Sequence, residues 1–394
     1  MASRPSVAPV VLMYSAFVFV SSELFPLSAL ATIAADLGVS ESRVGLLLSG
    51  YAVVVAVTVV PVTRWASLLD RRTALGFTLA CLALSGLGSA LAPSYAVLIV
   101  CRLVMALGHG LFWASVGSVA ARLAPAGRQG RATATVFTGN ALALILGVPL
   151  LNAGATALGW RWAAGLSAVA AGIAAIALWR ALPSLPPVRR TDTPNEPTRA
   201  GRRQVFALSA STLLVVAAYF ATYTFVTPLL DGAGIRGAAQ SGVLLGLGAL
   251  GLAGIRLTAA VADGWPLPTL VIQSLVTTAA FGWALVAAGQ ASTLAWLGLL
   301  ALSYSGLAVS WQGIVLKLAP DWPDEASSIY IVAFQIGIAT GPAVGGLVRV
   351  MGDWVMFAIS LALAAGGVLA AALIRHPGLR SVGRRSGDVG CRVR

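Results

Sequence analysis

The sequence predicts an all-helical membrane protein whose twelve transmembrane helices form two parallel six-helix repeats. Hydrophobic residues make up 58% of the chain, charged residues only 10%, and the mean hydropathy is +0.89. A soluble domain carries about 25% charged residues, so this composition indicates a protein that crosses the membrane many times. Helices are the expected spanning form, because a helix satisfies its own backbone hydrogen bonds in lipid.

The apolar segments follow one another in two sets of six. The first set covers residues 10–34, 44–63, 74–92, 95–121, 132–157 and 161–182. The second set covers residues 205–230, 239–262, 266–289, 292–318, 327–349 and 353–374. The first segment is about 25 residues long and ends without a clear cleavage site, which indicates a retained span rather than a signal peptide.

The stretch between the two sets has the composition of a linker. Pro183–Arg203 reads PSLPPVRRTDTPNEPTRAGRR and is rich in proline and charge. Gly147-Val148-Pro149 and Gly341-Pro342, in the fifth span of each half, show weak internal similarity, which indicates two repeats around a central cavity. We therefore predict an N-terminal bundle over 1–182, a cytoplasmic linker over 183–204, a C-terminal bundle over 205–375 and a basic cytoplasmic tail over 376–394.

Basic residues set the predicted orientation. Of the 26 Lys and Arg residues, 21 lie in predicted inner connections or terminal segments, four lie in outer connections, and Arg102 lies within a span. This bias predicts that both termini are cytoplasmic. One inner connection disagrees, because Asp321, Asp324 and Glu325 outnumber Lys317 there. Acidic residues weigh little in this rule, so the predicted orientation stands.

Several function classes do not fit the sequence. The net charge of +13 comes from residues in connections and a tail without interleaved aromatic residues, which argues against nucleic-acid binding. No glycine run is followed by the GK[ST] of a phosphate-binding loop, so ATP drive is not expected. The chain has only two His residues and offers no credible catalytic set. We therefore expect no cofactor, no metal and no enzymatic activity.

Glu23 is the most informative residue of the chain. It lies in the otherwise uncharged segment Val10–Ala34 and is the only carboxylate deep within a predicted span. An acid in such a place is costly, so it usually faces a protein-lined cavity and takes part in transport or proton movement. The alternative is a structural hydrogen bond that holds the kink near Pro26.

Three residues of the fourth span add to this candidate site. Arg102 needs a partner within the membrane, either an acid, backbone carbonyls or water. His109 follows seven residues later and therefore lies on nearly the same helix face, with Trp113 four residues further on. This face could line a cavity with a titratable ring and an aromatic plate. Alternatively, Arg102 caps carbonyls and His109 only joins helices.

Polar and aromatic residues in other spans are candidates for substrate binding. Amide side chains both donate and accept hydrogen bonds, as binding of a sugar requires. Tyr219 and Tyr223 share a face of the seventh span. The full set is Trp113, Asn140, Tyr219, Tyr223, Tyr304, Trp311, Gln312 and Gln335, with Gln273 as a further intramembrane amide. The alternative role for each of these residues is packing between helices.

Four stretches of the chain resemble the twelve-span drug:proton antiporters of the major facilitator superfamily, and bacterial sugar efflux transporters most of all. They are Glu23-Leu24-Phe25-Pro26, Tyr51–Ala56 followed by Pro61, Arg102–Trp113 (RLVMALGHGLFW) followed by Ala124-Pro125, and Gly139–Pro149. The resemblance covers nearly all of residues 10–375. It implies a major facilitator fold in a bacterial inner membrane, with spans one, four, seven and ten around the cavity. It also implies proton coupling through Glu23, Arg102 and His109.

The resemblance further implies a set of gating residues. The glycine and proline runs of spans five and eleven are expected to act as hinges, although passive packing explains them equally well. The loop Arg64–Leu75 (RWASLLDRRTAL) departs from the family pattern, because Ser67 replaces the usual Asp. Asp70 is the candidate substitute. The expected gating residues are Pro26, Asp70, Arg71, Arg72, Gly147, Pro149, Gly341 and Pro342.

These observations predict a secondary active transporter that exports sugars or related small polar metabolites by proton antiport and alternating access. The expected partners are protons, a small-molecule substrate and the lipid bilayer, and the expected state is a monomer. A multidrug exporter with the same fold is the first alternative. A sensor or scaffold that keeps the fold without transport is a remote one, because the linker and tail leave no room for an added soluble domain.

Overall fold

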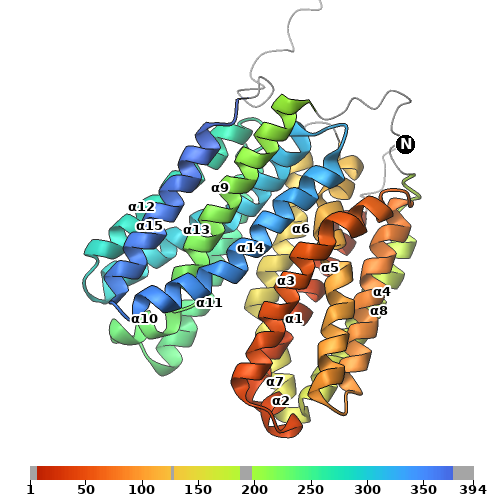
Figure 1. Cartoon of the computed structure of the whole chain (residues 1–394), viewed down its shortest axis with the longest axis horizontal. Coiled ribbons are helices and arrows are strands. Elements are labelled where there is room, and N and C mark those ends of the chain that lie inside the picture. The colour runs from red at the N-terminus through yellow and green to blue at the C-terminus, as the bar shows by residue number, and fades with distance from the viewer. Residues whose placement is uncertain (1–6, 126–127, 187–197, 376–394) are drawn as a thin grey trace, which may run out of the picture.

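The computed structural model describes residues 7–125, 128–186 and 198–375, and these residues form helices joined by short connections (Figure 1). The first bundle contains α1 (Ala8–Ser28), α2 (Leu30–Leu37), α3 (Glu41–Ala66), α4 (Arg71–Ala90), α5 (Tyr95–Leu123), α6 (Gln129–Leu142), the π-helix η1 (Ala143–Gly147), α7 (Val148–Leu158) and α8 (Trp160–Ala181). The second contains α9 (Arg199–Tyr223), α10 (Val226–Gly232), α11 (Gly237–Val261), α12 (Pro266–Val286), α13 (Gly289–Leu318), α14 (Pro323–Arg349) and α15 (Asp353–Ala372).

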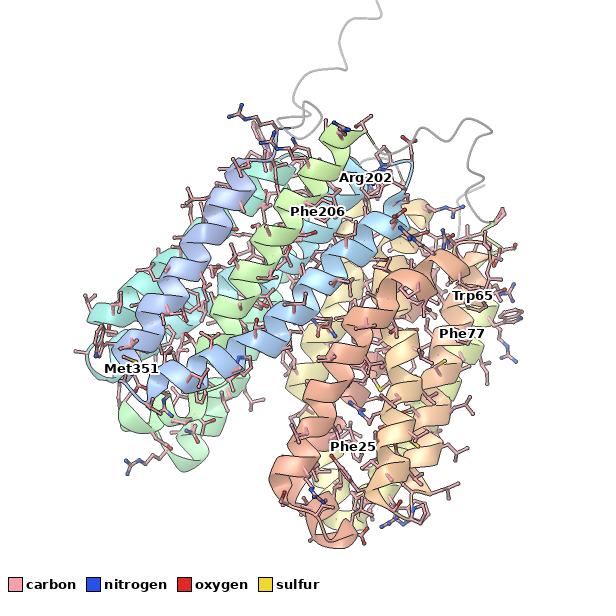
Figure 2. All side chains as sticks on the ribbon, in the orientation of Figure 1. Phe25, Trp65, Phe77, Arg202, Phe206 and Met351 are labelled. Carbon is pink, nitrogen blue, oxygen red and sulfur yellow. The ribbon has the colours of Figure 1, made fainter. Side chains whose placement is uncertain are left out.

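Within the described residues, twelve helical segments are long and apolar enough to cross a membrane, which confirms the predicted fold class. Large apolar side chains cover the outer surfaces of both bundles. Trp65 and Phe206 are 52% and 58% exposed and lie on different bundles (Figure 2). Such exposure would be unfavourable in water, but it suits contact with lipid tails.

Proline explains where two predicted spans depart from a straight helix. Predicted span 10–34 is divided at Ala29 into α1 and α2, three residues after Pro26. In span five, Pro149 has no N–H to donate to the carbonyl of Ile145, and the preceding turn widens into η1. Gly147 is the last residue of this widened turn, and Pro149 follows two residues later.

Two further predicted boundaries need correction. Predicted span 205–230 is divided at Thr224 and Phe225 between α9 and α10. Residues 199–204, placed in the linker by composition, form the start of α9, which Thr198 caps by accepting the N–H of Gly201 at 3.1 Å. The basic tail over 376–394 lies outside the described residues.

Helices approach closely where glycines replace larger side chains. A Cβ atom on Gly139 of α6 would collide with the backbone carbonyl of Met13 on α1. A Cβ atom on Gly345 of α14 would likewise collide with the backbone carbonyl of Ala221 on α9. The glycine runs thus bring α6 against α1 and α14 against α9, as small residues do in membrane helices.

The two bundles converge at one end of the molecule, where α3 ends and α14 begins, and diverge toward α2, α7 and α10 (Figure 1). The convergent end is also where the chain passes from α8 to α9, and we call it the linker end. Contacts between the bundles involve α3 with α14 on one flank and α6 with α11 on the other.

Candidate functional site

Arg102 on α5 is buried and holds the kinked region of α1. Its Nη1 donates to the carbonyl of Ser22 at 2.8 Å, and its Nη2 donates to the carbonyl of Glu23 at 2.6 Å. Ser22 lies four residues before Pro26, which has no N–H, so the helix itself leaves this carbonyl without a partner. The guanidinium therefore satisfies a carbonyl that proline frees. This is the carbonyl-capping alternative considered for Arg102.

The Glu23 carboxylate lies beside His109. Oε2 of Glu23 is 3.7 Å from Nδ1 of His109, and the two side chains are 15% and 4% exposed. That separation is longer than a hydrogen bond, and within the described part of the chain Nδ1 has no hydrogen-bond partner. A small side-chain movement or one water would connect the two groups. The pair is thus arranged so that a proton has two neighbouring acceptors next to the fixed charge of Arg102.

Aromatic rings enclose this pair and limit its contact with water. The Tyr51 ring lies 5.3 Å from the His109 ring, and the Arg102 guanidinium lies 4.9 Å above the same Tyr51 ring. Phe19 of α1 lies 5.9 Å from His109 on another side. Tyr51 and Phe19 were not among the predicted site residues. Tyr51 could have been found from the sequence, because it places a polar hydroxyl within the second apolar segment.

Of the other first-half candidates, Trp113 lies close to this cluster. Trp113 lies 6.3 Å from His109 and stacks against Phe137 of α6 at 5.5 Å. Its indole is largely buried, so Trp113 packs between helices and does not present an exposed aromatic face. Asn140 lies one turn further along α6 and is half-buried.

Three predicted tyrosines come together in the second bundle. The rings of Tyr219 on α9 and Tyr304 on α13 are parallel, with centroids 3.6 Å apart. Tyr223 stacks on Tyr219 at 4.8 Å. The Tyr304 hydroxyl is buried and has no hydrogen-bond partner among the described residues. This stack (Tyr219, Tyr223 and Tyr304) offers flat apolar surface and one free polar group, which suits a ligand with an aromatic ring and a hydrogen-bonding substituent.

Trp311 lies apart from the tyrosine stack. It is fully buried, packs 6.5 Å from Tyr330 and 6.3 Å from Phe334, and its Nε1 lacks a partner within the described ranges. Gln335 on α14 is also buried, with an Nε2 that likewise lacks a described partner. These two donors add to the polar groups left unpaired in the second bundle.

Two other amides join helices. Gln312 donates to Ser327 of α14 at 3.1 Å, and its side chain lies where Gly117 of α5 leaves space between the bundles. Gln273 accepts a hydrogen bond from Ser310 at 2.6 Å and donates to Thr258. The contacts of Gln312 and Gln273 therefore match their alternative role in packing between helices.

Ion pairs connect the two bundles at the linker end. Arg71 at the start of α4 pairs with Asp324 at the start of α14, and both side chains are buried. Ser118 of α5 donates to the same carboxylate at 3.1 Å, and Arg64 pairs with Glu325 at 2.5 Å. Asp324 was not a predicted site residue. The sequence signal for Asp324 was the excess of acidic residues in the connection before α14. This connection lies opposite the arginine-rich loop Arg64–Leu75.

Asp70 and Arg72 stay within the first bundle. Asp70 caps α4 by accepting the N–H of Arg72 at 2.9 Å, and it accepts the Ser184 hydroxyl at 2.7 Å. Burial by itself would raise the pKa of Asp70, but the hydrogen bonds from Ser184 and from the backbone of Arg72, Thr73 and Leu185 outweigh it and hold that pKa below its usual value. Arg72 lies over the Trp179 ring at 4.1 Å. Of the three predicted gating residues in this loop, Arg71 is the one with an ion pair to the second bundle among the described residues.

The remaining predicted gating residues lie at helix contacts. Gly147 sits against the side chains of Ser21 and Phe17 on α1. Gly341 sits against Ala217 and Phe220 on α9, one residue before Pro342 within α14. Both positions combine close packing with a proline.

The sequence is similar to that of known proteins along most of its length. The model of the Major Facilitator Superfamily matches residues 10–342. Chloramphenicol efflux pumps of Mycobacterium tuberculosis strains H37Rv and CDC 1551 / Oshkosh are each 38% identical over 354 residues, which cover 86% of this chain and 84% of each pump.

Solved structures with 15% identity share the fold. The proton:xylose symporter XylE aligns over 95% of this chain and 96% of its own, with a TM-score of 0.75. The human organic anion transporter MFSD10 aligns over 93% and 99%, with a TM-score of 0.74. From the family match over most of the sequence, the twelve helical spans and this shared architecture, the chain belongs to the Major Facilitator Superfamily and is a multi-pass membrane transporter.

Proposed function

We propose that this chain exports drug-like compounds in exchange for protons, from a bacterial inner membrane with both termini in the cytoplasm. The sequence favoured sugars as substrates. The chloramphenicol efflux pumps, at 38% identity, support the drug alternative better. The tyrosine stack agrees with this choice, because it is built of aromatic rings rather than of amides.

The Glu23–His109 pair is the observation that carries proton coupling. The carboxylate is partly exposed, so water entering between the bundles can reach it, while Arg102 supplies a permanent neighbouring charge. Protonation of Glu23 removes a negative charge from a site where that charge is costly. In the proposed cycle, a proton from the outside binds the Glu23 carboxylate after the drug has left. It passes to cytoplasmic water when the next drug binds.

The second bundle supplies the proposed drug contacts. A planar ring would stack on the face of Tyr304 that is turned away from Tyr219, and the free Tyr304 hydroxyl would pair with a polar substituent. Trp113 and Asn140 would line the proposed drug site on the side of the first bundle. Gln335 and Trp311 would contribute their unpaired donors after a local movement.

The linker end would act as the cytoplasmic gate. Arg71–Asp324 and Arg64–Glu325 hold the bundles together there, which supports a conformation closed toward the cytoplasm. Opening this end would break both pairs, while the π-helical turn that ends at Gly147 and the proline-containing stretch at Gly341 and Pro342 would absorb the rearrangement. Asp70 and Arg72 would keep the loop of the first bundle in place. We further propose a monomeric transporter of two six-helix domains.

A susceptibility test separates drug from sugar export. Cells that express the full chain are compared with cells that express Glu23→Gln, for growth in chloramphenicol and a panel of dyes and for accumulation of labelled sugars. We expect the wild type to raise chloramphenicol tolerance several-fold and Glu23→Gln to lose that effect. Unchanged tolerance together with reduced sugar accumulation would return the assignment to sugars.

A further inference from the structure

A small cavity of about 20 Å³ lies inside the first bundle, among α1, α4, α5 and α8. Its lining residues come from the second halves of α1 and α4 and the first halves of α5 and α8. The cavity therefore lies away from the linker end, near Phe25 (Figure 2). No acidic residue lines it, and its polar lining consists of Arg102, Ser22, Ser85, Ser89 and Ser167.

The guanidinium of Arg102 keeps donors that it does not use within the protein. Three of its five N–H groups donate to the carbonyls of Ser22 and Glu23 and to Sδ of Met105. Nε is buried and has no hydrogen-bond partner among the described residues. Within the same part of the chain, Arg102 forms no ion pair. A buried positive charge with unused N–H groups therefore adjoins the cavity.

The serines add hydroxyl donors to this positive charge. In the described ranges, the hydroxyls of Ser22 and Ser85 form no hydrogen bond, whereas Ser167 donates to the Ala163 carbonyl at 3.1 Å. A guanidinium and free hydroxyls, without a carboxylate, suit an anion rather than a cation. A cavity of this size holds one water molecule or one monatomic ion, and it is too small for a phosphate or a carboxylate group.

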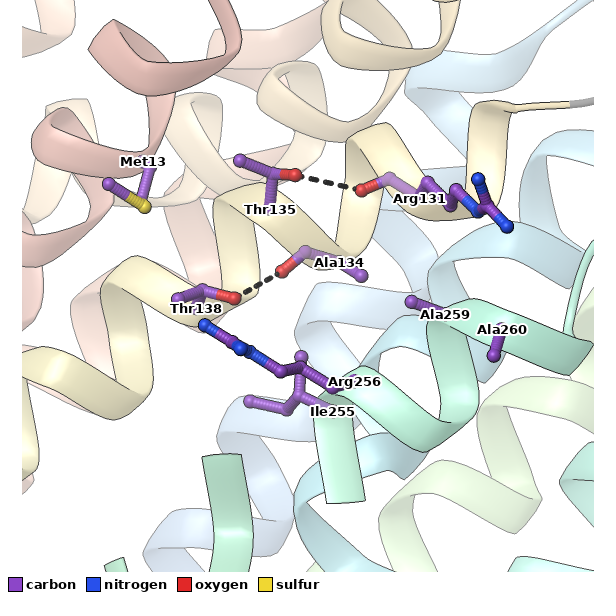
Figure 3. Close-up of a pocket in the computed structure, with 9 residues that line it drawn as sticks. All are labelled: Met13, Arg131, Ala134, Thr135, Thr138, Ile255, Arg256, Ala259 and Ala260. Atoms are coloured by element: carbon purple, nitrogen blue, oxygen red, sulfur yellow. Dashed lines mark hydrogen bonds between the residues drawn. The ribbon is translucent and has the colours of Figure 1, made fainter. Parts of the chain in front are cut away.

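Burial distinguishes this site from the larger cavity of the molecule. Arg131 and Arg256 line a cavity of about 350 Å³ between α6 and α11, where their side chains extend away from each other (Figure 3). Both are exposed, so water and dissolved ions already screen their charges. Arg102 is only 4% exposed and lies within a membrane span. Its charge therefore requires a partner inside the protein.

We propose that the small cavity binds a single monatomic anion, chloride in the cell, held by Arg102 and the hydroxyls of Ser22 and Ser85. The bound ion supplies the negative charge that the carbonyl dipoles of α1 supply only in part. Glu23 interacts electrostatically with the same guanidinium, so a negative charge on its carboxylate opposes anion binding. The site does not depend on the proposed drug export, because the ion binds without a drug.

Thermal unfolding of the purified full chain tests the proposal. The protein in an uncharged detergent is titrated with sodium chloride, while sodium gluconate keeps the ionic strength constant. We expect a saturable rise of the unfolding midpoint with chloride and with bromide. Sulfate at equal concentration should give no saturable rise, because a polyatomic ion does not fit the cavity. An equal or larger rise with sulfate would indicate a general salt effect and overturn the proposal.

Two serine variants locate the ion. Ser85→Ala should weaken the apparent affinity for chloride about fivefold, because it removes one hydrogen bond. The matched control is Ser211→Ala, which removes an equally buried hydroxyl without a described partner, but from α9 of the second bundle. This control should leave the affinity unchanged. Equal weakening by both variants would overturn the assigned site.

Glu23→Gln tests the contact with Arg102, because it removes the competing negative charge. Chloride should bind this variant several-fold more tightly than the wild type, and an unchanged affinity would place the ion away from Arg102 and overturn the proposal. Equilibrium dialysis of the wild type with radiolabelled chloride gives a second reading. We expect about one bound ion per chain, whereas no bound chloride would leave water alone in the cavity and would also overturn the proposal.

Discussion

Arg71 and Asp324 form a buried ion pair that joins the start of α4 in the first bundle to the start of α14 in the second. Asp324 also accepts the Ser118 hydroxyl at 3.1 Å, so one carboxylate connects three helices. A buried charge that loses its partner is strongly destabilising, whereas removal of both partners is much less so. This relationship leads directly to a test of the proposed gate.

Arg71→Ala and Asp324→Ala should each destabilise the protein by about 3–5 kcal/mol, because each leaves one buried charge unpaired. The double variant should lose much less than the sum of the two losses. A double-mutant cycle on the free energy of unfolding measures the coupling between them. Additive losses would show that the pair does not act as a unit. Arg72→Ala, which remains within the first bundle, serves as the control.

Arg102 and Pro26 should show a second coupling. Pro26→Ala restores an N–H that can reach the Ser22 carbonyl, so this carbonyl no longer depends on Arg102. Arg102→Gln should therefore cost about 1–2 kcal/mol less stability in the Pro26→Ala background than in the wild type. The measurement is the unfolding midpoint of the four proteins. An equal cost in both backgrounds contradicts the capping role.

Tyr304→Phe separates drug contact from packing. The Tyr304 hydroxyl is buried without a described partner, so its removal should leave stability unchanged or slightly improved. If the hydroxyl binds a drug substituent, affinity for chloramphenicol should fall about fivefold to tenfold. Affinity is measured as equilibrium binding of labelled drug to the purified protein. The matched control is Tyr95→Phe, whose hydroxyl donates to the Arg43 carbonyl at 2.5 Å and whose loss should affect stability alone. Unchanged affinity in Tyr304→Phe would remove this hydroxyl from the drug site.

Asp36 on α2 gives a prediction on pH. Its hydrogen bonds from Arg161, and then from Trp160 at 3.1 Å, lower the pKa of its carboxyl. A lowered folded-state pKa stabilises the protein above the unfolded value of about 3.9, and this contribution disappears as pH falls through the folded value. Because the side chain is 43% exposed, the stabilisation should be at most about 1 kcal/mol. Asp36→Asn should therefore lower the unfolding midpoint slightly at pH 7, and this difference should shrink as pH falls through the folded-state pKa. A larger difference in acid than at pH 7 would reverse the sign and contradict this account.

Much of the architecture followed from the sequence, because lipid leaves a long apolar segment few alternatives to a helix. Helical spacing also placed Arg102 and His109 on one face, and the structure has both beside Glu23. The partner of Arg102 did not follow, because the freed Ser22 carbonyl becomes a partner only once α1 and α5 pack together. For the same reason the sequence did not predict the contact between Tyr219 and Tyr304, which lie on different spans.

The hydrophobic pattern of the sequence also did not predict where individual helices are interrupted. Hydropathy averages over many residues, so it did not detect the break at Ala29 or the division at Phe225. Asp324 was visible as an exception to the charge rule, but its role depends on the approach of two bundles that are far apart along the chain.

Proton release on drug binding tests the central claim most directly. Purified protein in weakly buffered solution, loaded with protons at mildly acidic pH, is mixed with chloramphenicol while a pH-sensitive dye is followed. We predict that the wild type releases about one proton per bound drug. Glu23→Gln should bind the drug without releasing a proton, and His109→Gln should still release it if Glu23 is the carrier. Undiminished proton release from Glu23→Gln would contradict the account.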